Sequence, residues 1–284
     1  MGHFTLDRSI LEGVMQYLPG GTAFYTSMAL NSLTPSFSLI TSFGSGDTQF
    51  FERVLSSIEN VEVLPNKATH EFENSYDSSG DHRIQYVHRK ADPFNTLQMK
   101  APSRNLCHLG PLLKNDFSRE LMFQLARENI ISLDVQGFLR HLDGHQVVLK
   151  TWPEMVEILP IVNILKMNEQ EFEWLMHSHT EREGLENLLQ MGVREIVLTK
   201  GSHGSLIMTP DDAVSVPAFR CSAVVDPTGC GDTYMAGYLY MRFIKGKTIE
   251  EAGLFASAMA SMKLEHRGPF SGSEEEVLSR MKSG

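Results

Sequence analysis

The chain has 284 residues, of which 42% are apolar and 21% charged, so its composition is that of a globular protein. Its formal net charge of −10, with no basic stripe, argues against a surface that binds nucleic acid. No apolar run approaches the roughly 20 residues that a membrane span needs, and the first residues lack the charged region and apolar run that are typical of a signal peptide. Three scattered cysteines predict reduced thiols in a cytoplasmic protein.

Two adjacent glycines precede the first predicted helix. Gly20 and Gly21 lead into residues 22–30, which carry small side chains on one face. Glycine lets the backbone approach a ligand closely, and the first turn of a helix has N–H groups without intrahelical partners. The pattern indicates a close-approach loop, although paired glycines before a helix more often form an ordinary turn.

The next segment predicts a β-hairpin inserted into a βαβ chain. Residues 36–41 form a short apolar strand, and residues 49–60 form a helix. Between residues 67 and 92, two alternating runs flank a loop that contains Gly80, which is typical of a hairpin. The residues alone leave open whether this hairpin contacts a substrate or lies on the surface.

Buried strands and helices alternate through the middle of the chain. Residues 105–109 and 130–137 predict strands, with an amphipathic helix at residues 117–128 between them. Asp134 and Gln136 lie at the C-terminal end of the second strand, where open parallel sheets bind ligands. Both residues are equally compatible with helix capping or with a loop.

A further strand at residues 161–167 ends in Asn168, which opens a helix, and Glu171 follows three residues later. This spacing is that of a capping box, apart from the usual Ser or Thr. Residues 195–204 then predict a strand and a turn with two glycines, and residues 205–217 predict a second hairpin.

The most informative stretch is the glycine-rich loop of residues 224–237. Here Gly229, Cys230 and Gly231 join the end of an apparent strand to a helix at residues 234–244. Such a loop is an anion site, because its backbone approaches closely and the helix start offers free N–H groups. Asp232 places a carboxylate there, as expected of a base that takes a proton from a group attacking a phosphate. Turn chemistry and the helix dipole also favour an acid at this position.

The run Asp-x-Thr-Gly-x-Gly-Asp-x-x-x-Ala-Gly at residues 226–237 resembles the C-terminal signature of the PfkB/ribokinase family of carbohydrate kinases. The paired glycines, the hairpin, Asn168-x-x-Glu171 and Thr199-x-Gly-x-x-Gly204 resemble further family motifs, in the family's order. Cys230 replaces the usual alanine, and the asparagines that usually follow the paired glycines are absent. Residues 134–140 resemble a branch that includes inositol-kinase-like and nucleoside-kinase-like proteins.

This resemblance implies an α/β fold over residues 1–284 as a single domain. The fold would be a ribokinase-like αβα sandwich with a mostly parallel central sheet and a small β-lid. The lid would comprise approximately residues 8–18 and 67–92, and it would carry a homodimer contact. Family members begin with a longer apolar strand than residues 2–7 allow, so we expect that native residues are missing before Met1 or that the start codon was placed late.

The activity implied by the resemblance is ATP-dependent transfer of the γ-phosphoryl group to a hydroxyl of a sugar or polyol. Asp232 would be the catalytic base, and the N–H groups of Gly229, Cys230 and Gly231 would form the anion hole. The residues implied for binding ATP are Thr199, Lys200, Gly201 and Gly204. The residues implied for binding substrate are Asp7, Gly20, Gly21 and Thr22, although Asp7 is equally compatible with a turn.

The resemblance also implies two cations. Asn168 and Glu171 would position Mg²⁺, through water, because Mg²⁺ favours few carboxylates together with waters and phosphates. A monovalent cation such as K⁺ would lie near Asp226 and order the anion hole, held mainly by backbone oxygens.

Two other functions stay open at this point. A nucleoside kinase of the same fold would use aromatic side chains such as Phe24 or Tyr25 to stack on a base, although both residues are also compatible with the core. A non-catalytic regulator that binds nucleotide or sugar would share the fold, since fold does not fix function. The presence of Asp232 and Glu171 argues against the regulator.

Overall fold

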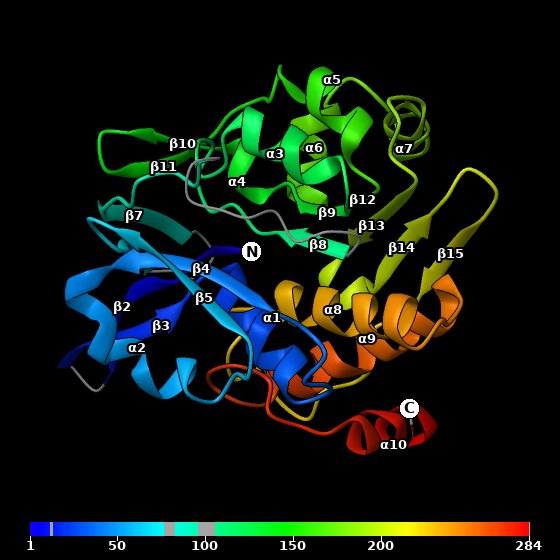
Figure 1. Cartoon of the computed structure of the whole chain (residues 1–284). Helices are drawn as coiled ribbons and strands as arrows, with labels where there is room; N and C mark the ends of the chain where they lie inside the picture. Colours follow the sequence, from blue (N-terminus) through cyan, green and yellow to red (C-terminus); the bar gives the residue numbers. More distant parts are fainter. Residues whose placement is uncertain (12–13, 77–82, 96–105, 284) are drawn as a thin grey trace.

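The computed structural model describes residues 1–11, 14–76, 83–95 and 106–283, and its centre is a layer of mostly parallel strands (Figure 1). Strands β1 (Gly2–His3), β4 (Leu39–Gly44) and β5 (Val61–Asn66) form one parallel group. A second group runs in the order β15, β14, β13, β12, β9 and β8. Met1 joins the groups, because its amine donates to the His108 carbonyl and its carbonyl accepts from Gly110 N–H.

The second group is parallel except at its edge. Its strands are β8 (Leu106–Leu109), β9 (Ile130–Asp134), β12 (Ile164–Asn168), β13 (Glu195–Thr199), β14 (Ser205–Met208) and β15 (Ala213–Val216). Only the pairs β13–β14 and β14–β15, at this edge, are antiparallel. Strands β9, β12 and β13 are near-continuous runs of buried residues, as expected where helices cover both faces of a sheet.

Helices cover both faces of this layer, so the predicted αβα sandwich is confirmed. In Figure 1 one helical layer lies above the strands and the other below them. The upper layer comprises α3 (Arg119–Ala126), α4 (Gln136–Leu139), α5 (Met155–Ile158), α6 (Glu169–Met176) and α7 (Glu181–Gln190). The lower layer comprises α1 (Thr22–Asn31), α8 (Cys230–Leu239) and α9 (Ile249–Leu264), with α2 (Thr48–Leu55) and α10 (Glu274–Ser283) at its edges.

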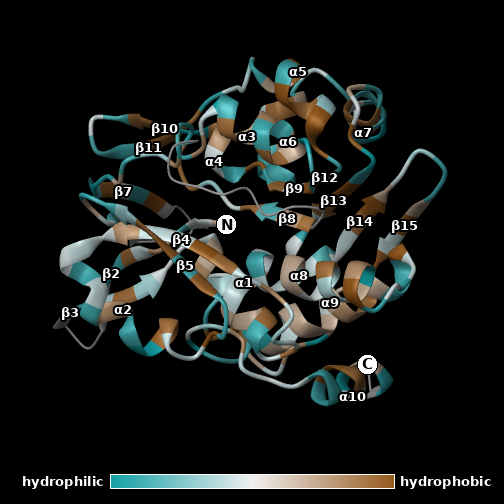
Figure 2. Cartoon of the chain, in the orientation of Figure 1, coloured by the Kyte–Doolittle hydropathy of each residue, from teal (hydrophilic) through white to brown (hydrophobic). Residues whose placement is uncertain are grey.

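Each helical layer has its own apolar core against the sheet. Apolar residues alternate with polar ones around the helices, as the mixed colours of Figure 2 show. One core packs β9, β12 and β13 against α3, α6 and α7, and the other centres on α8 and α9. Within the described ranges, no helix is both long and apolar enough to cross a bilayer.

A separate sheet lies beside the sandwich and covers one end of it (Figure 1). Its strands are β2 (Thr5–Leu11), β3 (Val14–Gly20), β6 (His70–Tyr76), β7 (Arg83–Arg89), β10 (Arg140–Asp143) and β11 (Gln146–Leu149). We call this sheet the lid. The hairpin expected at residues 67–92 forms as β6 and β7, but its loop at residues 77–82 lies outside the described residues.

The β10–β11 hairpin of the lid was not anticipated from the sequence. It pairs Asp143 with Gln146 across a tight turn in which Gly144 has a φ of 57°. Asp-Gly is a hairpin signal, but each strand has only four residues and shows little alternation. Strand β5 was missed as well, and the helix expected at residues 234–244 begins earlier, at Cys230.

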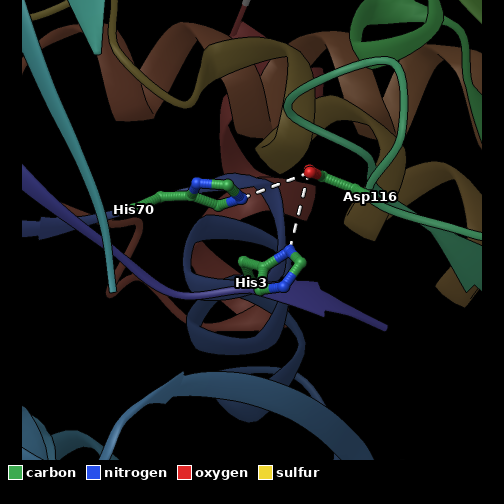
Figure 3. Close-up of side chains that lie close together, drawn as sticks. All are labelled: His3, His70 and Asp116. Atoms are coloured by element: carbon green, nitrogen blue, oxygen red, sulfur yellow. Dashed lines mark hydrogen bonds and ion pairs between the residues drawn. The ribbon is translucent and has the colours of Figure 1, made fainter. Parts of the chain in front are cut away.

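A buried cluster fastens the lid to the central sheet (Figure 3). Asp116, from the loop before α3, accepts from His70 of β6 (3.2 Å) and lies 3.6 Å from His3 of β1. Burial alone would raise the pKa of Asp116, but His70 and His3 lower it well below its usual range. The His70 Nδ1 atom accepts from Ala91 N–H, so the ring carries its proton on the Nε2 atom that faces Asp116. That nitrogen therefore donates to Asp116 and does not offer a lone pair to a metal.

Replacement of Asp116 by asparagine should weaken the attachment of the lid. The change removes a buried carboxylate that also accepts from the N–H groups of Leu112 and Leu113. We expect a loss of about 3 kcal/mol in the free energy of unfolding, measured by urea denaturation. The control is Asp143→Asn on the exposed β10 turn, which should change stability little. An Asp116→Asn protein as stable as the wild type would contradict this role.

Candidate active site

A cavity of about 890 Å³ lies between the lid and the carboxyl ends of β9, β12 and β13. The start of α8 forms its floor, with Gly229, Cys230, Gly231 and Asp232 all in the lining. A larger hollow of about 1190 Å³ lies elsewhere, and of the predicted site residues only Thr22 lines it. We therefore take the smaller cavity, which is lined by most of the predicted site residues, as the candidate active site.

The loop before α8 has the geometry of an anion cradle. Gly229 caps the helix with a φ of 76°, and a Cβ there would lie 2.2 Å from the ring of Tyr25, so only glycine fits. The Cys230 N–H donates to the Pro227 carbonyl at 3.2 Å. Because the remaining first-turn amides have no intrahelical acceptors, they are available to an anion at the positive end of the helix dipole. Burial raises the pKa of the Cys230 thiol to about 11, so the thiol stays protonated.

Asp232 stands in the first turn of α8 and faces the start of α1. The Thr22 hydroxyl is close enough to lower the pKa of its carboxylate. Burial, and then the negative charge of Asp134, raise the pKa of Asp232 to about 6, against the opposing effects of Lys166, Thr22 and Arg140. A carboxylate with a pKa close to neutral is suited to accepting a proton and holding it during a reaction.

A buried lysine connects the acidic groups of the site. The register of β12 and β9 places Lys166 beside Asp134, and the Nζ–Oδ2 distance is 2.8 Å. Burial disfavours the charge on Lys166, but Asp134, Glu171 and Asp232 together outweigh that effect and raise its pKa. A Cβ on Gly231 would lie 3.2 Å from Nζ, so the ammonium borders the anion cradle.

The sequence interpretation missed Lys166 as a site residue. The available signal was a lysine inside the otherwise apolar strand of residues 161–167, because a buried lysine needs a paired charge. Gln136, which was noted at the ligand-binding end of its strand, lines the cavity, and so does Arg140, which was not singled out as a contact. They lie at the ends of the short helix α4, whose position over the site depends on tertiary packing.

Asn168 and Glu171 form a complete capping box at the start of α6. Each side chain accepts from the other residue's backbone N–H at 2.8 Å. Asn168 lines the cavity, whereas Glu171 is buried behind it, and burial is the main cause that raises the pKa of Glu171. The carboxylates of Asp134, Glu171 and Asp232 all act on the ammonium of Lys166, and Arg140 adds a second positive charge that acts on Glu171 and Asp232. This excess of negative oxygen donors fits a Mg²⁺ ion held through water.

The residues predicted to bind ATP divide into two groups. Thr199, Gly201 and Gly204 line the cavity at the end of β13. Lys200 is not among the lining residues, and its ammonium pairs with Glu181 of α7 at 2.6 Å.

Beyond β13, the wall of the cavity is largely apolar. The residues that form it come from the segment after β15 and from α9. The apolar ones are Ala218, Phe219, Val224, Ala260 and Leu264, and Arg220, Ser257 and Ser261 add polar groups to the same wall.

The residues predicted to bind substrate gather under the lid. Asp7, Gly21 and Thr22 line the cavity. The turn-forming alternative for Asp7 is wrong, because Asp7 lies within β2 opposite Leu18 and accepts from the Thr5 hydroxyl at 2.7 Å. Gly20 lies behind Asp7, where a Cβ would come within 2.2 Å of the carboxylate, so glycine is required for this close packing.

The aromatic residues proposed for stacking do not form a base platform. Phe24 is not among the lining residues and packs with Phe4 in the core. Tyr25 lines the cavity, but it is almost completely buried and packs under Gly229. Phe72 of the lid is the aromatic residue on the substrate side of the lining, and it too is buried.

Comparisons with known proteins identify the family of the chain. The model of the pfkB family carbohydrate kinases matches residues 7–276. The nucleoside kinase of Methanocaldococcus jannaschii is 38% identical over 114 residues, which are 40% of this chain and 36% of that protein. Inositol 3-kinase of Arabidopsis thaliana is 25% identical over 281 residues, which are 94% of this chain and 74% of that protein. The chain thus spans about a third of the first relative's length and about three quarters of the second's.

Solved structures share the fold over almost the whole chain. A pyrophosphate-dependent kinase in the ribokinase family superposes with a TM-score of 0.86 and 25% identity, covering 98% of both chains. The Burkholderia thailandensis nucleoside kinase in complex with inosine has a TM-score of 0.77 and 22% identity, covering 99% of this chain and 96% of that one.

Proposed function

Because this chain belongs to the pfkB family of carbohydrate kinases, we propose that it transfers the γ-phosphoryl group of ATP to a hydroxyl of a sugar or cyclic polyol. It has the ribokinase-like α/β fold and is a phosphotransferase with a hydroxyl acceptor. The donor, the acceptor and the residue roles are the proposed part. The observation that carries them is the Asp232 carboxylate beside the anion cradle of α8.

In the proposed mechanism Asp232 accepts the proton of the attacking hydroxyl. Its carboxylate, raised in pKa to about 6, is largely ionised at neutral pH but basic enough to take that proton. The N–H groups of Gly229 and Gly231 and the dipole of α8 stabilise the charge on the transferring phosphoryl group, whereas the Cys230 N–H is held by the Pro227 carbonyl. The Lys166 ammonium adds positive charge at the edge of the cradle. Mg²⁺, positioned by Asn168 and Glu171 through water, would neutralise phosphate charge.

The lining under the lid supports a polyhydroxylated acceptor. Asp7, Gln85, Gln136 and Arg140 bring hydrogen-bonding groups from several directions. These groups match a ring that carries many hydroxyls, whereas a base would need an aromatic or apolar slot. A nucleoside acceptor is the second candidate, because a nucleoside kinase is among the similar proteins. A non-catalytic regulator is disfavoured, because a protein that only binds its ligand does not need the buried carboxylate of Asp232 and the buried ammonium of Lys166 beside the cradle.

ATP is the proposed donor because of the apolar wall next to the cradle. Adenine would lie between the segment that carries Ala218 and Phe219 and the helix face of Ala260 and Leu264. Pyrophosphate would leave this surface exposed to water, which the hydrophobic effect disfavours. Since a solved structural neighbour is described as pyrophosphate-dependent, the donor needs a direct test.

A bulky side chain at position 260 should weaken the binding of ATP without affecting the use of pyrophosphate. Ala260→Tyr would fill the proposed adenine site while leaving the cradle of α8 unchanged. We expect KM for ATP to rise at least about tenfold, a loss of roughly 1.4 kcal/mol in binding, with little change in any rate measured with pyrophosphate. The control is Ala213→Tyr on the exposed face of β15. Equal effects on both donors, or none on ATP, would argue against adenine at this wall.

The first test of the activity is release of product from ATP or pyrophosphate with a panel of sugars, inositols and nucleosides. Asp232→Asn serves as the blank. An Asp232-dependent signal with ATP and one sugar or polyol would support the proposal. A signal only with nucleosides would identify a nucleoside, not a sugar or polyol, as the acceptor. A signal only with pyrophosphate would identify pyrophosphate, not ATP, as the donor. Silence across the panel with ATP bound would favour the regulator.

We also propose that the lid carries a homodimer contact. Strand β3 is an edge strand of the lid, and its residues Met15, Tyr17 and Leu18 are exposed. An exposed apolar edge is a surface on which a second copy can pair. Sedimentation equilibrium should show a dimer that Leu18→Lys dissociates, whereas a monomeric wild-type protein would exclude it.

A further inference from the structure

A fully buried lysine stands at the end of α9 and takes no part in the mechanism above. The side chain of Lys263 has no exposed surface. Its ammonium donates to the Asp226 carbonyl at 2.8 Å and to the His266 carbonyl at 3.2 Å. The Asp226 carboxylate lies 3.3 Å away. Two backbone carbonyls and one carboxylate therefore converge on a single positive charge.

These contacts fix the turn that precedes the anion cradle, and we call the turn and the cradle together, residues 226–231, the anion loop. Asp226 lies three residues before Gly229, and its carboxylate accepts from the N–H groups of Thr228 (2.9 Å) and Gly268 (3.3 Å). The backbone N–H of Asp226 in turn donates to the Leu264 carbonyl at 3.3 Å. Lys263 thus joins the C-terminal end of α9 to the turn that leads into the cradle.

The position of this ammonium disagrees with the monovalent cation expected near Asp226. A K⁺ ion binds in proteins to rings of carbonyl and carboxylate oxygens. Here the converging oxygens of Asp226 and His266 already contact an ammonium, which carries the same charge. A free cation among the same oxygens would lie next to Nζ, and like charges in a partly buried site repel strongly. The residues present therefore do not fit a free monovalent ion.

We propose that the Lys263 ammonium is a built-in monovalent cation that orders the anion loop, so that neither the fold nor the reaction requires K⁺. The role of the loop in holding phosphoryl charge rests on the proposed function. The replacement of a free cation by Lys263 does not, because it can be measured on the unliganded protein. The test therefore uses thermal unfolding before it uses activity.

Two variants at position 263 are expected to respond differently to K⁺. Lys263→Ala removes both charge and volume, and it leaves the oxygens of Asp226 and His266 around a space that K⁺ can enter. Lys263→Met removes the charge but fills most of the same space. The matched control is Lys247→Ala, which removes an exposed lysine that pairs with Glu251.

Unfolding temperatures are compared in KCl, NaCl and choline chloride at equal ionic strength. The wild type and Lys247→Ala should unfold at the same temperature in all three salts. Lys263→Ala should be destabilised in choline chloride and recover in KCl, saturably, by about 2–4 °C for each 1 kcal/mol regained. Lys263→Met should be destabilised without recovery in any salt.

Activity then tests the role of the loop. Once a phosphorylated acceptor is known, wild-type turnover should be equal in the three salts. Lys263→Ala should lose at least about tenfold in choline chloride, which is roughly 1.4 kcal/mol of barrier, and regain activity in KCl.

Three outcomes would overturn the inference. The first is selective stabilisation of the wild type by K⁺, which would show that a free ion binds despite Lys263. The second is an identical salt response of Lys263→Ala and Lys263→Met, which would show that no cation site opens. The third is that K⁺ restores the stability of Lys263→Ala but not its turnover, which would show that the cation does not order the anion loop for the reaction. If neither variant folds, the salt response of the wild type still decides between a built-in and a free cation.

Discussion

Replacing Asp232 by asparagine is expected to abolish phosphoryl transfer and, at the same time, to stabilise the fold. A general base contributes about 10²–10⁴-fold to a rate, so we expect turnover to fall by at least about a thousandfold. Donor binding should persist, because the amides of Gly229 and Gly231 and the apolar wall are unchanged. Asparagine keeps the shape of the side chain.

The expected gain in stability follows from the pKa of Asp232, which rises from 3.8 to about 6 in the folded chain. Between these two values the folded protein holds a proton that the unfolded chain has released, so stability falls as the pH rises through this window. At neutral pH the ionised carboxylate costs up to about 3 kcal/mol. Asparagine removes that cost, so the variant should be more stable at pH 7 and lose its advantage near pH 4.

Activity and stability should therefore respond to pH in opposite directions. In the wild type, kcat/KM should rise with pH through about 6 as Asp232 ionises, while the free energy of unfolding falls over the same range. The measurements are a pH–rate profile and urea denaturation at two pH values. Asp211→Asn, on an exposed turn, is the control. Near-normal turnover of Asp232→Asn would exclude its role as the base, and unchanged stability would exclude the raised pKa.

The parts of the site that could be predicted from the sequence are those encoded by adjacent residues. A glycine that must adopt a positive φ, free N–H groups at a helix start and an acid in the first turn all lie within Gly229–Asp232. Local geometry alone makes such a segment an anion cradle. The same applies to Asn168 and Glu171, whose spacing correctly predicted a capping box. Their part in holding Mg²⁺ stays a prediction.

The parts that could not be predicted depend on contacts between distant residues. Lys166 and Asp134 are 32 positions apart and meet only because β12 and β9 pair in one particular register. Lys263 and Asp226 are brought together by the packing of α9 against the loop before α8. Periodicity reports which face of an element is buried, but not which neighbour it meets. The local sign of each ion pair was a lysine within an otherwise apolar segment: Lys166 in a strand and Lys263 in a helix.

Replacing Lys166 by methionine should have the largest effect on stability. The ammonium is the only positive charge recorded in hydrogen-bond contact with Asp134 among the described residues, and Asp134 is 1% exposed. Removing one partner of a buried ion pair typically costs about 3–5 kcal/mol. Methionine fills nearly the same volume, so a cavity contributes little. The control is Lys114→Met, which breaks the more exposed pair with Glu154 and should cost about 1 kcal/mol or less.

The same change should alter the acid limb of the pH–rate profile. Lys166 lowers the pKa of Asp232, so its removal should raise that pKa further above about 6. Turnover at pH 7 should then fall because less of Asp232 is ionised, and part of the loss should be regained at higher pH. The part that alkaline pH does not restore measures the contribution of the ammonium at the edge of the cradle beside Gly231.

A double variant separates the structural role of Lys166 from its role in the reaction. Lys166→Met combined with Asp134→Asn removes both charges while keeping the Asp134 side-chain oxygen that accepts from Gln136 N–H. Replacing both members of a buried ion pair is often nearly neutral for stability, so the fold should recover most of what the single change lost. Turnover should stay low, because the cradle still lacks its ammonium. If turnover recovers together with stability, Lys166 only neutralises Asp134, and the phosphoryl charge is stabilised by the amides and Mg²⁺ without it.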